Sequence, residues 1–128
     1  MIIDTSALLA VFLGEPERRR FLEAITQTEE RRISAANVLE TGIVLEARRG
    51  EAAGREFDLF LNQAKVTISA VDADQIEIAR VAWRKYGKGR HPAGLNFGDC
   101  FAYALAKMLG EPLLAKGSDF AQTDIKLC

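Results

Sequence analysis

The chain has 128 residues, 48% of them hydrophobic, and its 17 basic and 18 acidic side chains leave a net charge of −1. This predicts one domain with a sizeable core, and it argues against a protein that binds nucleic acid over its whole surface. Two cysteines without a CxxC pair give no support to a disulfide framework or a thiolate zinc site, and because neither a membrane span nor a secretory signal is apparent, we expect a cytoplasmic protein without a membrane partner.

The first half of the chain shows short apolar runs followed by helical patterns. Residues 1–3 form an apolar run that predicts a strand ending at Asp4, and Thr5 and Ser6 can cap the helix that follows. The next expected elements are a helix over 16–28, a very short strand at 33–34, a helix over 35–49 that stops at Gly50, and a helix over 51–64.

The second half continues the same alternation. Apolar and polar residues alternate over 65–71, which predicts a strand. Asp72 can cap a helix that runs to Tyr86, and GKGRHPAG at 87–94 is typical of a loop. Asn96 opens a helix that ends at Gly110, and short strands are expected at 113–115 and 125–127. Short strands alternating with helices favour an α/β sandwich with a mainly parallel sheet.

Four carboxylates stand alone among apolar residues: Asp4 in MIIDTSALL, Glu40 in NVLETGIVL, Asp99 in NFGDCFAYALA and Asp119 in KGSDF. Each would be costly to desolvate singly, so together they call for a shared counter-charge. In a parallel sheet, ligands bind beyond the carboxyl ends of the strands, where Asp4 and Asp119 are expected. Because carboxylate oxygens suit Mg²⁺ or Mn²⁺, these four residues are candidate catalytic groups of a hydrolytic metal site.

Each acid also has an ordinary structural interpretation. Asp4 can cap the first helix, and Asp99 stands three residues after Asn96, where a carboxylate suits a helix N-terminus. Asp119 fits a turn, and Glu40 can be a snorkelling or salt-bridged side chain. Glu40 is the least readily explained in this way, since it is the only charged residue between 35 and 45.

Histidine is nearly absent, because His91 is the only one in the chain. A histidine-rich metal site, an HExxH protease, a Ser-His-Asp triad and a zinc deaminase all need histidines that this sequence does not supply. The remaining chemistry relies on carboxylates and metal-bound water.

At these acids the chain resembles PIN-domain ribonucleases, and more narrowly the VapC toxins of bacterial VapBC toxin–antitoxin pairs. The resemblance covers essentially the whole chain, as a single PIN domain over 1–128, and it rests on these segments in this order: MIIDTSALLAVFLGEPE, SAANVLETGIVLEAR and HPAGLNFGDCFAYALAKMLGEPLLAKGSDFAQTDI. It implies a three-layer α/β/α sandwich and the toxin of a type II toxin–antitoxin system. The implied activity is a Mg²⁺-dependent endoribonuclease, with Mn²⁺ as a possible substitute, that hydrolyses RNA phosphodiester bonds with metal-activated water.

The resemblance also implies roles for individual residues. Asp4 and Asp99 match direct metal ligands, while Glu40 and Asp119 match groups that bind a second ion or orient the attacking water. Ser6 matches a small polar residue that supports the first acid. Many relatives carry two acids where this chain has only Asp119 after KGS.

Asp124, five residues further on, is therefore an alternative fourth acid. Basic side chains near the acids would contact RNA, and our candidates are in the 87–94 loop: Lys88, Arg90 and His91. A mobile surface loop is the alternative interpretation of this segment. The substrate implied by resemblance is a transfer RNA or a ribosomal RNA loop.

Two protein partners are implied as well. These are a second copy of the chain, as a homodimer, and an inhibitory VapB-type antitoxin that lies in an apolar groove near the first four helices. Four apolar side chains are candidates for that groove, although core burial is expected for most of them: Phe12, Leu13, Phe21 and Leu22.

Two other functions are compatible with an aspartate after the first strand. One is another metal-dependent phosphohydrolase or phosphotransfer module, either a haloacid-dehalogenase-like phosphatase or a receiver-like domain. The phosphatase would need a second aspartate where this chain has Ser6, and the receiver would need an adjacent acid pair. The other is a catalytically inert binding domain.

Overall fold

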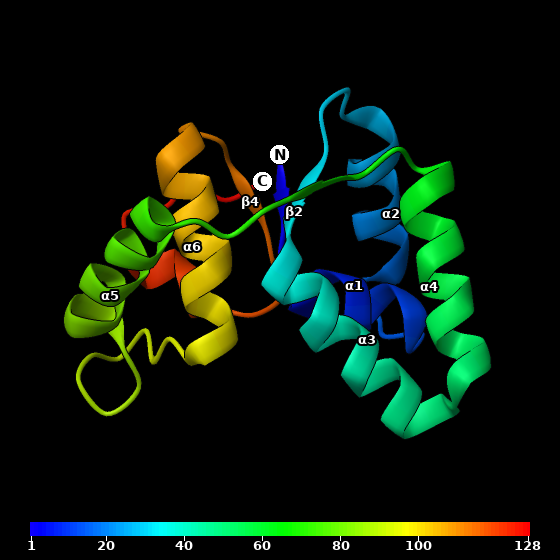
Figure 1. Ribbon diagram of the computed structural model, residues 1–128, viewed down its shortest axis with the longest axis horizontal. Helices are drawn as coiled ribbons and strands as arrows, with labels where there is room; N and C mark the ends of the chain where they lie inside the picture. The colour runs from blue at the N-terminus through cyan, green and yellow to red at the C-terminus, as the bar shows by residue number, and fades with distance from the viewer.

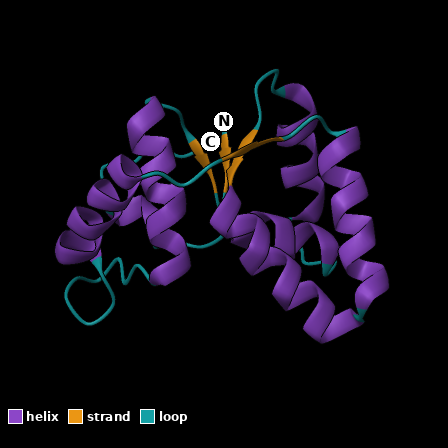
Figure 2. Ribbon diagram, viewed as in Figure 1, coloured by secondary structure: helices purple, strands orange, loops and turns teal.

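A parallel sheet of four short strands runs through the middle of the computed structural model, which describes residues 1–128 (Figure 2). The strand order is β3-β2-β1-β4, and every neighbouring pair is parallel. The strands are β1 (Ile2–Ile3), β2 (Arg32–Ser34), β3 (Thr67–Ser69) and β4 (Leu113–Leu114). All carboxyl ends therefore lie at one edge of the sheet, as the sequence predicted for a mainly parallel arrangement.

Helices cover both faces of this sheet (Figure 1). One face is covered by α1 (Thr5–Phe12), α2 (Arg18–Gln27), α3 (Ala35–Arg49) and α4 (Glu51–Gln63), and the other by α5 (Ala73–Tyr86) and α6 (Phe97–Leu109). A short 3₁₀ helix spans Phe120–Gln122. The three-layer α/β/α sandwich is confirmed.

Alternation along the strands creates two cores. Ile2 and Leu113 belong to the cluster that α5 and α6 cover, whereas Ile3 and Leu114 belong to the cluster on the side of α1 to α4. Successive strand residues point to opposite faces, so two-residue strands suffice to anchor both layers. The sheet edge between the two layers is consequently held rigidly on both sides.

Helix ends follow the capping signals in the sequence. Ser34 accepts a hydrogen bond from the Ala36 amide at the start of α3, and Asp72 does the same for Gln75 at the start of α5. Gly110 ends α6 in the left-handed conformation (φ 65°), which costs glycine little. The expected ends of α3 and α6 are confirmed.

Some predicted elements are shorter than expected. The strand predicted over 65–71 is reduced to β3, since Lys65 has a positive φ of 52°. The strand predicted at 125–127 is wrong: only a single bridge pairs Leu127 with Leu113. Helix α2 begins at Arg18 instead of residue 16. No helix has the length and apolar character needed to cross a membrane.

Candidate active site

Three of the four predicted acids line one pocket at the carboxyl edge of the sheet. Asp4 directly follows β1, Glu40 lies in α3, and Asp99 lies in the first turn of α6. The pocket has a volume of about 220 Å³, and we call it the acid pocket; its other lining residues are Thr5, Ser6, Leu9, Val44 and Asn96. The parallel topology accounts for this convergence, because β1 delivers Asp4 to the edge where α3 and α6 begin.

Asp4 combines a capping role with an unused oxygen. Its Oδ2 accepts the Ser6 amide at 2.9 Å and caps α1, while its Oδ1 is buried without any hydrogen-bond partner. The pKa of Asp4 is raised to about 7, chiefly by burial and to a smaller extent by the charges of Asp99 and Glu40, while hydrogen bonds from Ser6 oppose the shift. The predicted capping role is therefore correct for one oxygen and leaves the other free for a ligand.

Ser6 supports this arrangement from a second direction. Its Oγ accepts a hydrogen bond from the Lys116 amide at 2.9 Å, which ties the start of α1 to the loop after β4. The Ser6 amide at the same time holds Asp4. Ser6 thus links Asp4 to the segment that leads to Asp119.

Asp99 also has both a structural contact and a perturbed pKa. It forms a capping box with Asn96, in which Asp99 Oδ2 accepts the Asn96 amide at 3.0 Å and Asn96 Oδ1 accepts the Asp99 amide at 2.9 Å. Burial raises the pKa of Asp99 to about 6, with further contributions from the charges of Asp119 and Glu40. The capping box fixes Asp99 at the mouth of the acid pocket.

Glu40 has no cationic partner. Its Oε1 accepts a hydrogen bond of 3.4 Å from Nδ2 of Asn37, one turn earlier in α3. The predicted alternative of a salt-bridged glutamate is wrong, because no ion pair includes Glu40. Asn37 was not among the residues predicted for the site, although its spacing of three residues from Glu40 on a helix was a usable signal.

The two candidates for a fourth acid have different surroundings. Asp119 is exposed and precedes the 3₁₀ helix without capping it. Its negative charge contributes to the raised pKa of Asp99. Asp124 instead accepts hydrogen bonds of 2.6 Å from both Tyr103 and Lys107, and these contacts lower its pKa. Asp119 is the acid whose charge acts on the acid pocket, although it does not line it.

The predicted RNA-contacting residues lie outside the acid pocket. Lys88 and Arg90 are exposed, and the Arg90 guanidinium stacks 4.7 Å from the centre of the Trp83 ring. His91 packs edge-on against Tyr86 at 5.2 Å, and its Nδ1 accepts a hydrogen bond from Ala93. Arg90 is thus held against α5 by Trp83 and, through its Nε, by the Arg84 carbonyl oxygen, and His91 packs against Tyr86 of the same helix.

The predicted groove residues are mostly core, as expected. Phe21 is fully buried, and Phe12, Leu13 and Leu22 are half-buried against the core beneath α1 to α4. The exposed apolar side chains near the acids come from other helices: Leu39 and Ile43 of α3, and Phe97 of α6. The helical periodicity identified Phe97 as apolar but could not show that it is 82% exposed.

The acid pocket fits a hydrated divalent cation. No protein cation pairs with any of its acids, and a buried Asp4 oxygen lacks a partner. The side chains do not form a group of three or more that holds a metal ion through protein ligands alone. Mg²⁺ usually keeps several water ligands and uses only one or two carboxylates, so this arrangement suits it.

Comparison with known proteins identifies the fold and the family. The family model for the PIN domain matches residues 1–126. The chain is 57% identical over 125 residues to the ribonuclease VapC30 of Mycobacterium tuberculosis, covering 98% of this chain and 95% of that protein. It is 55% identical to a ribonuclease VapC of Mycolicibacterium smegmatis over 98% of this chain and 97% of the relative.

Solved structures with low sequence identity share the same fold. The sarcin–ricin-loop-cleaving toxin VapC20 of Mycobacterium tuberculosis aligns with a TM-score of 0.79 at 20% identity, covering 97% of this chain and 95% of the other. VapBC2 from Rickettsia felis, bound to a DNA fragment from its promoter, aligns with a TM-score of 0.74 at 14% identity, covering 98% of this chain and 94% of the other.

Proposed function

Because the chain belongs to the PIN-domain family, as one of its VapC ribonucleases, we propose that it hydrolyses RNA at the acid pocket with bound Mg²⁺. Ribonucleases of this family generally depend on a divalent metal ion, and Mn²⁺ is a suitable substitute here. The observation that carries the proposal is the buried, unpartnered Oδ1 of Asp4 beside Glu40 and Asp99. We assign the whole chain to one PIN domain.

We assign different roles in metal binding and water activation to the individual acids. Asp4 and Asp99 hold the ion, since each is fixed by a cap hydrogen bond at the carboxyl edge of the sheet. Glu40 orients the attacking water or accepts its proton, because its carboxylate is not neutralised by any cation of the protein. Asp119, outside the pocket, adds negative charge beside Asp99 and serves as a ligand for a second ion.

When bound, Mg²⁺ lowers the pKa of a water molecule and stabilises negative charge on the phosphodiester in the transition state. Before the ion binds, the acid pocket repels phosphate. The carboxylates must also lose their protons first, since burial holds the pKa of Asp4 near 7 and that of Asp99 near 6. Metal binding and activity should therefore both increase as the pH rises through this range.

RNA contacts are proposed on the side of α5. Lys88 and Arg90 carry exposed charges, and Arg90 lies against the indole of Trp83, which leaves an aromatic surface next to a cation. Single-stranded RNA loops commonly stack on such surfaces. We propose a loop of a structured RNA, from transfer RNA or ribosomal RNA, as the substrate.

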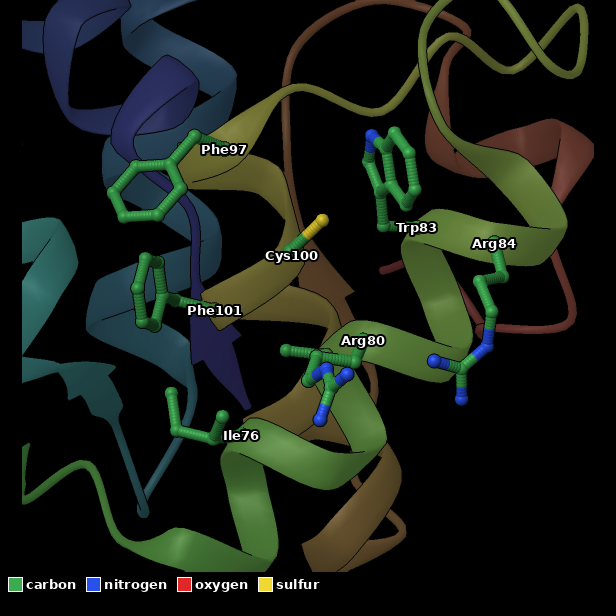
Figure 3. Close-up of a pocket in the computed structure, with 8 residues that line it drawn as sticks. Ile76, Arg80, Trp83, Arg84, Phe97, Cys100 and Phe101 are labelled. Atoms are coloured by element: carbon green, nitrogen blue, oxygen red, sulfur yellow. The ribbon is translucent and has the colours of Figure 1, made fainter.

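An apolar face supports the proposed homodimer. It runs continuously across two hollows of about 470 and 440 Å³ that share Phe97 and Phe101, the first between α5 and α6 (Figure 3) and the second between α6 and α3. Its exposed apolar side chains include Leu39, Ile43 and Phe97. Monomeric proteins rarely leave such a patch uncovered.

The charges at the ends of this face have opposite signs. Arg80 and Arg84 stand at the α5 end, and Glu46 and Asp58 at the end between α3 and α4. A twofold axis would bring the basic end of one copy to the acidic end of the other, which suits a self-complementary contact. Replacing Leu39 with Glu should convert the dimer to a monomer in light-scattering measurements, whereas replacing exposed Leu59 with Glu should not.

We also assign the protein to a toxin–antitoxin pair that acts in the cytoplasm. Structural neighbours include a toxin–antitoxin complex from Klebsiella pneumoniae and the VapBC2 complex. The expected partner is a VapB-type antitoxin that blocks access to the acid pocket. Induced expression of the chain alone should halt growth, and co-expression of the antitoxin should restore it.

Cleavage of RNA by purified variants tests the proposed function. Asp4→Asn and Asp99→Asn should each lower the Mg²⁺-dependent cleavage rate by at least about 100-fold, because each removes a charge that the metal and the transition state require. The control is Asp74→Asn, an exposed acid in the first turn of α5. Cleavage at the wild-type rate by either pocket variant would show that the site lies elsewhere.

A further inference from the structure

Asn37 is a polar side chain in an apolar position. It is 0% exposed and is the only polar residue among the largest fully buried side chains of the molecule. A buried amide of this kind is costly unless its hydrogen bonds are satisfied. Its partners therefore show which interaction it serves.

Both partners of its amide nitrogen belong to the active site region. Nδ2 donates to Glu40 Oε1 at 3.4 Å and to the backbone oxygen of Gly98 at 3.1 Å. Gly98 directly precedes Asp99 in α6. Because a carboxylate and a carbonyl are acceptors only, the NH₂ group of the amide has to face them. One side chain of α3 thus connects Glu40 to the backbone that carries Asp99.

Gly98 provides the space that Glu40 occupies. A Cβ atom at this position would overlap the Glu40 carboxylate, with Cδ only 2.5 Å away. The absence of a side chain at Gly98 is what lets the carboxylate lie against the first turn of α6. Asn37 thus donates to a carboxylate for which Gly98 leaves the room.

The other end of the amide argues against a purely structural role. Asn37 Oδ1 is buried and has no hydrogen-bond partner. An unsatisfied buried polar atom lowers stability. Packing alone therefore does not account for the amide, whereas its donor contacts to Glu40 and Gly98 do.

We propose that Asn37 is a positioning residue that fixes the Glu40 carboxylate relative to Asp99, with Gly98 providing the space for it. This inference rests on the proposed function, since it requires that Glu40 acts in RNA cleavage. Neighbours that orient a metal-site residue typically change activity by about 10- to 100-fold when they are replaced. Asn37 acts in the same way, through Glu40 and without contacting RNA or metal.

Asn37→Leu tests the proposal because leucine has the same number of side-chain heavy atoms and the same branching, and cannot donate a hydrogen bond. The matched control is Asn62→Leu, at an exposed asparagine of α4. We expect Asn37→Leu to lower kcat about 10- to 100-fold with KM little changed, measured at a temperature where circular dichroism shows the variant to be fully folded. Unchanged kcat, or a kcat loss explained by a lower melting temperature, would overturn the proposal.

A double-mutant cycle with Glu40→Ala separates this inference from the proposed function. If Asn37 acts through Glu40, the single-turnover cleavage rate of the double variant should equal that of Glu40→Ala alone. Multiplied losses would overturn the positioning role while leaving the proposed function intact. If Glu40→Ala itself retains the wild-type rate, the proposed role of Glu40 fails, and the role of Asn37 fails with it.

Two further measurements address the same geometry. Gly98→Ala should displace Glu40 and produce a similar kcat loss, and a wild-type kcat in this variant would contradict the need for space at Gly98. In the metal-free protein, Glu40→Gln should shift the side-chain ¹⁵N–¹H resonances of Asn37 but not those of Asn62. Resonances of Asn37 that do not respond would show that the two side chains are not coupled.

Discussion

The acids at the two edges of the parallel sheet differ in whether the protein provides them with cationic partners. At the edge where the strands begin, the Met1 amine lies 2.7 Å and Arg32 lies 3.5 Å from Glu111, and Arg32 also lies 3.4 Å from Glu30. At the edge where the strands end, the acid pocket holds three carboxylates and no protein cation. The acids at the first edge are paired within the chain, whereas the acids of the acid pocket have no counter-charge from the protein.

The difference shows where charge contributes to stability and where it serves a ligand. Compensated acids such as Glu111 join the start of one strand to the next. Uncompensated acids destabilise the metal-free protein at neutral pH, because their ionised forms are partly desolvated and repel each other. Perturbed pKa values at such a position are typical of functional sites.

The largest expected effect that distinguishes the two edges is a decrease in the stability of the metal-free protein as the pH rises. The pKa of Asp4 rises from 3.8 to about 7 on folding and that of Asp99 to about 6, so between about pH 4 and pH 7 the native state binds more protons than the unfolded state. The unfolding free energy, measured by urea denaturation in the presence of a chelator, should therefore fall by a few kcal/mol across this window.

Asp4→Asn is the internal control for this pH dependence. The variant should lose most of the slope and, without metal, be more stable than the wild type at pH 8. Asp124 does not mask the effect: its lowered pKa means that its contribution is lost only below 3.8. A wild-type stability that increases between pH 5 and pH 8 would contradict the electrostatic description of the acid pocket.

Glu111→Gln should produce the second largest effect, on the compensated edge. The substitution removes the acceptor charge for the Met1 amine and Arg32, and we expect a loss of about 1–3 kcal/mol in unfolding free energy. Cleavage at a temperature where the variant is folded should remain at the wild-type rate. Loss of activity in the folded variant would mean that the two edges are not independent.

The smallest expected effect distinguishes the two candidates for the fourth acid. Asp119→Asn should lower the cleavage rate about tenfold, equivalent to about 1.4 kcal/mol, because it removes the ligand proposed for a second ion outside the pocket. Asp124→Asn should lower the melting temperature, through lost contacts with Tyr103 and Lys107, and leave the rate unchanged. The reverse result would identify Asp124 as the fourth acid.

The sequence predicted the order of strands and helices because its signals are local. Gly50 and Gly110 end helices, and the apolar start before Asp4 forms β1. Strand lengths were overestimated, since periodicity does not show where pairing stops. Trp83 and Phe97 lie in helices as predicted. Their exposed fractions, 44% for Trp83 and 82% for Phe97, depend on tertiary packing, which a local pattern does not show.

For the site, the sequence identified acids that the parallel topology brings together, and it could not show how each oxygen is used. Capping and ligand binding were treated as alternatives for Asp4, whereas the structure has one oxygen for capping and the other free. The choice between Asp119 and Asp124 depends on Tyr103 and Lys107, contacts that no local pattern reveals. Asn37 was overlooked because asparagine in a helix has many roles.

Direct titration of the metal-free protein with Mn²⁺, followed by calorimetry or electron paramagnetic resonance at pH 7.5, tests the central claim most directly. The wild type and Glu111→Gln should bind the ion with the same affinity, whereas Asp4→Asn should bind it at least about 10-fold more weakly. The wild-type affinity should also decrease at pH 5.5, where Asp4 and Asp99 are largely protonated. Equal affinity in Asp4→Asn and the wild type would contradict a cation site at the carboxyl edge of the sheet.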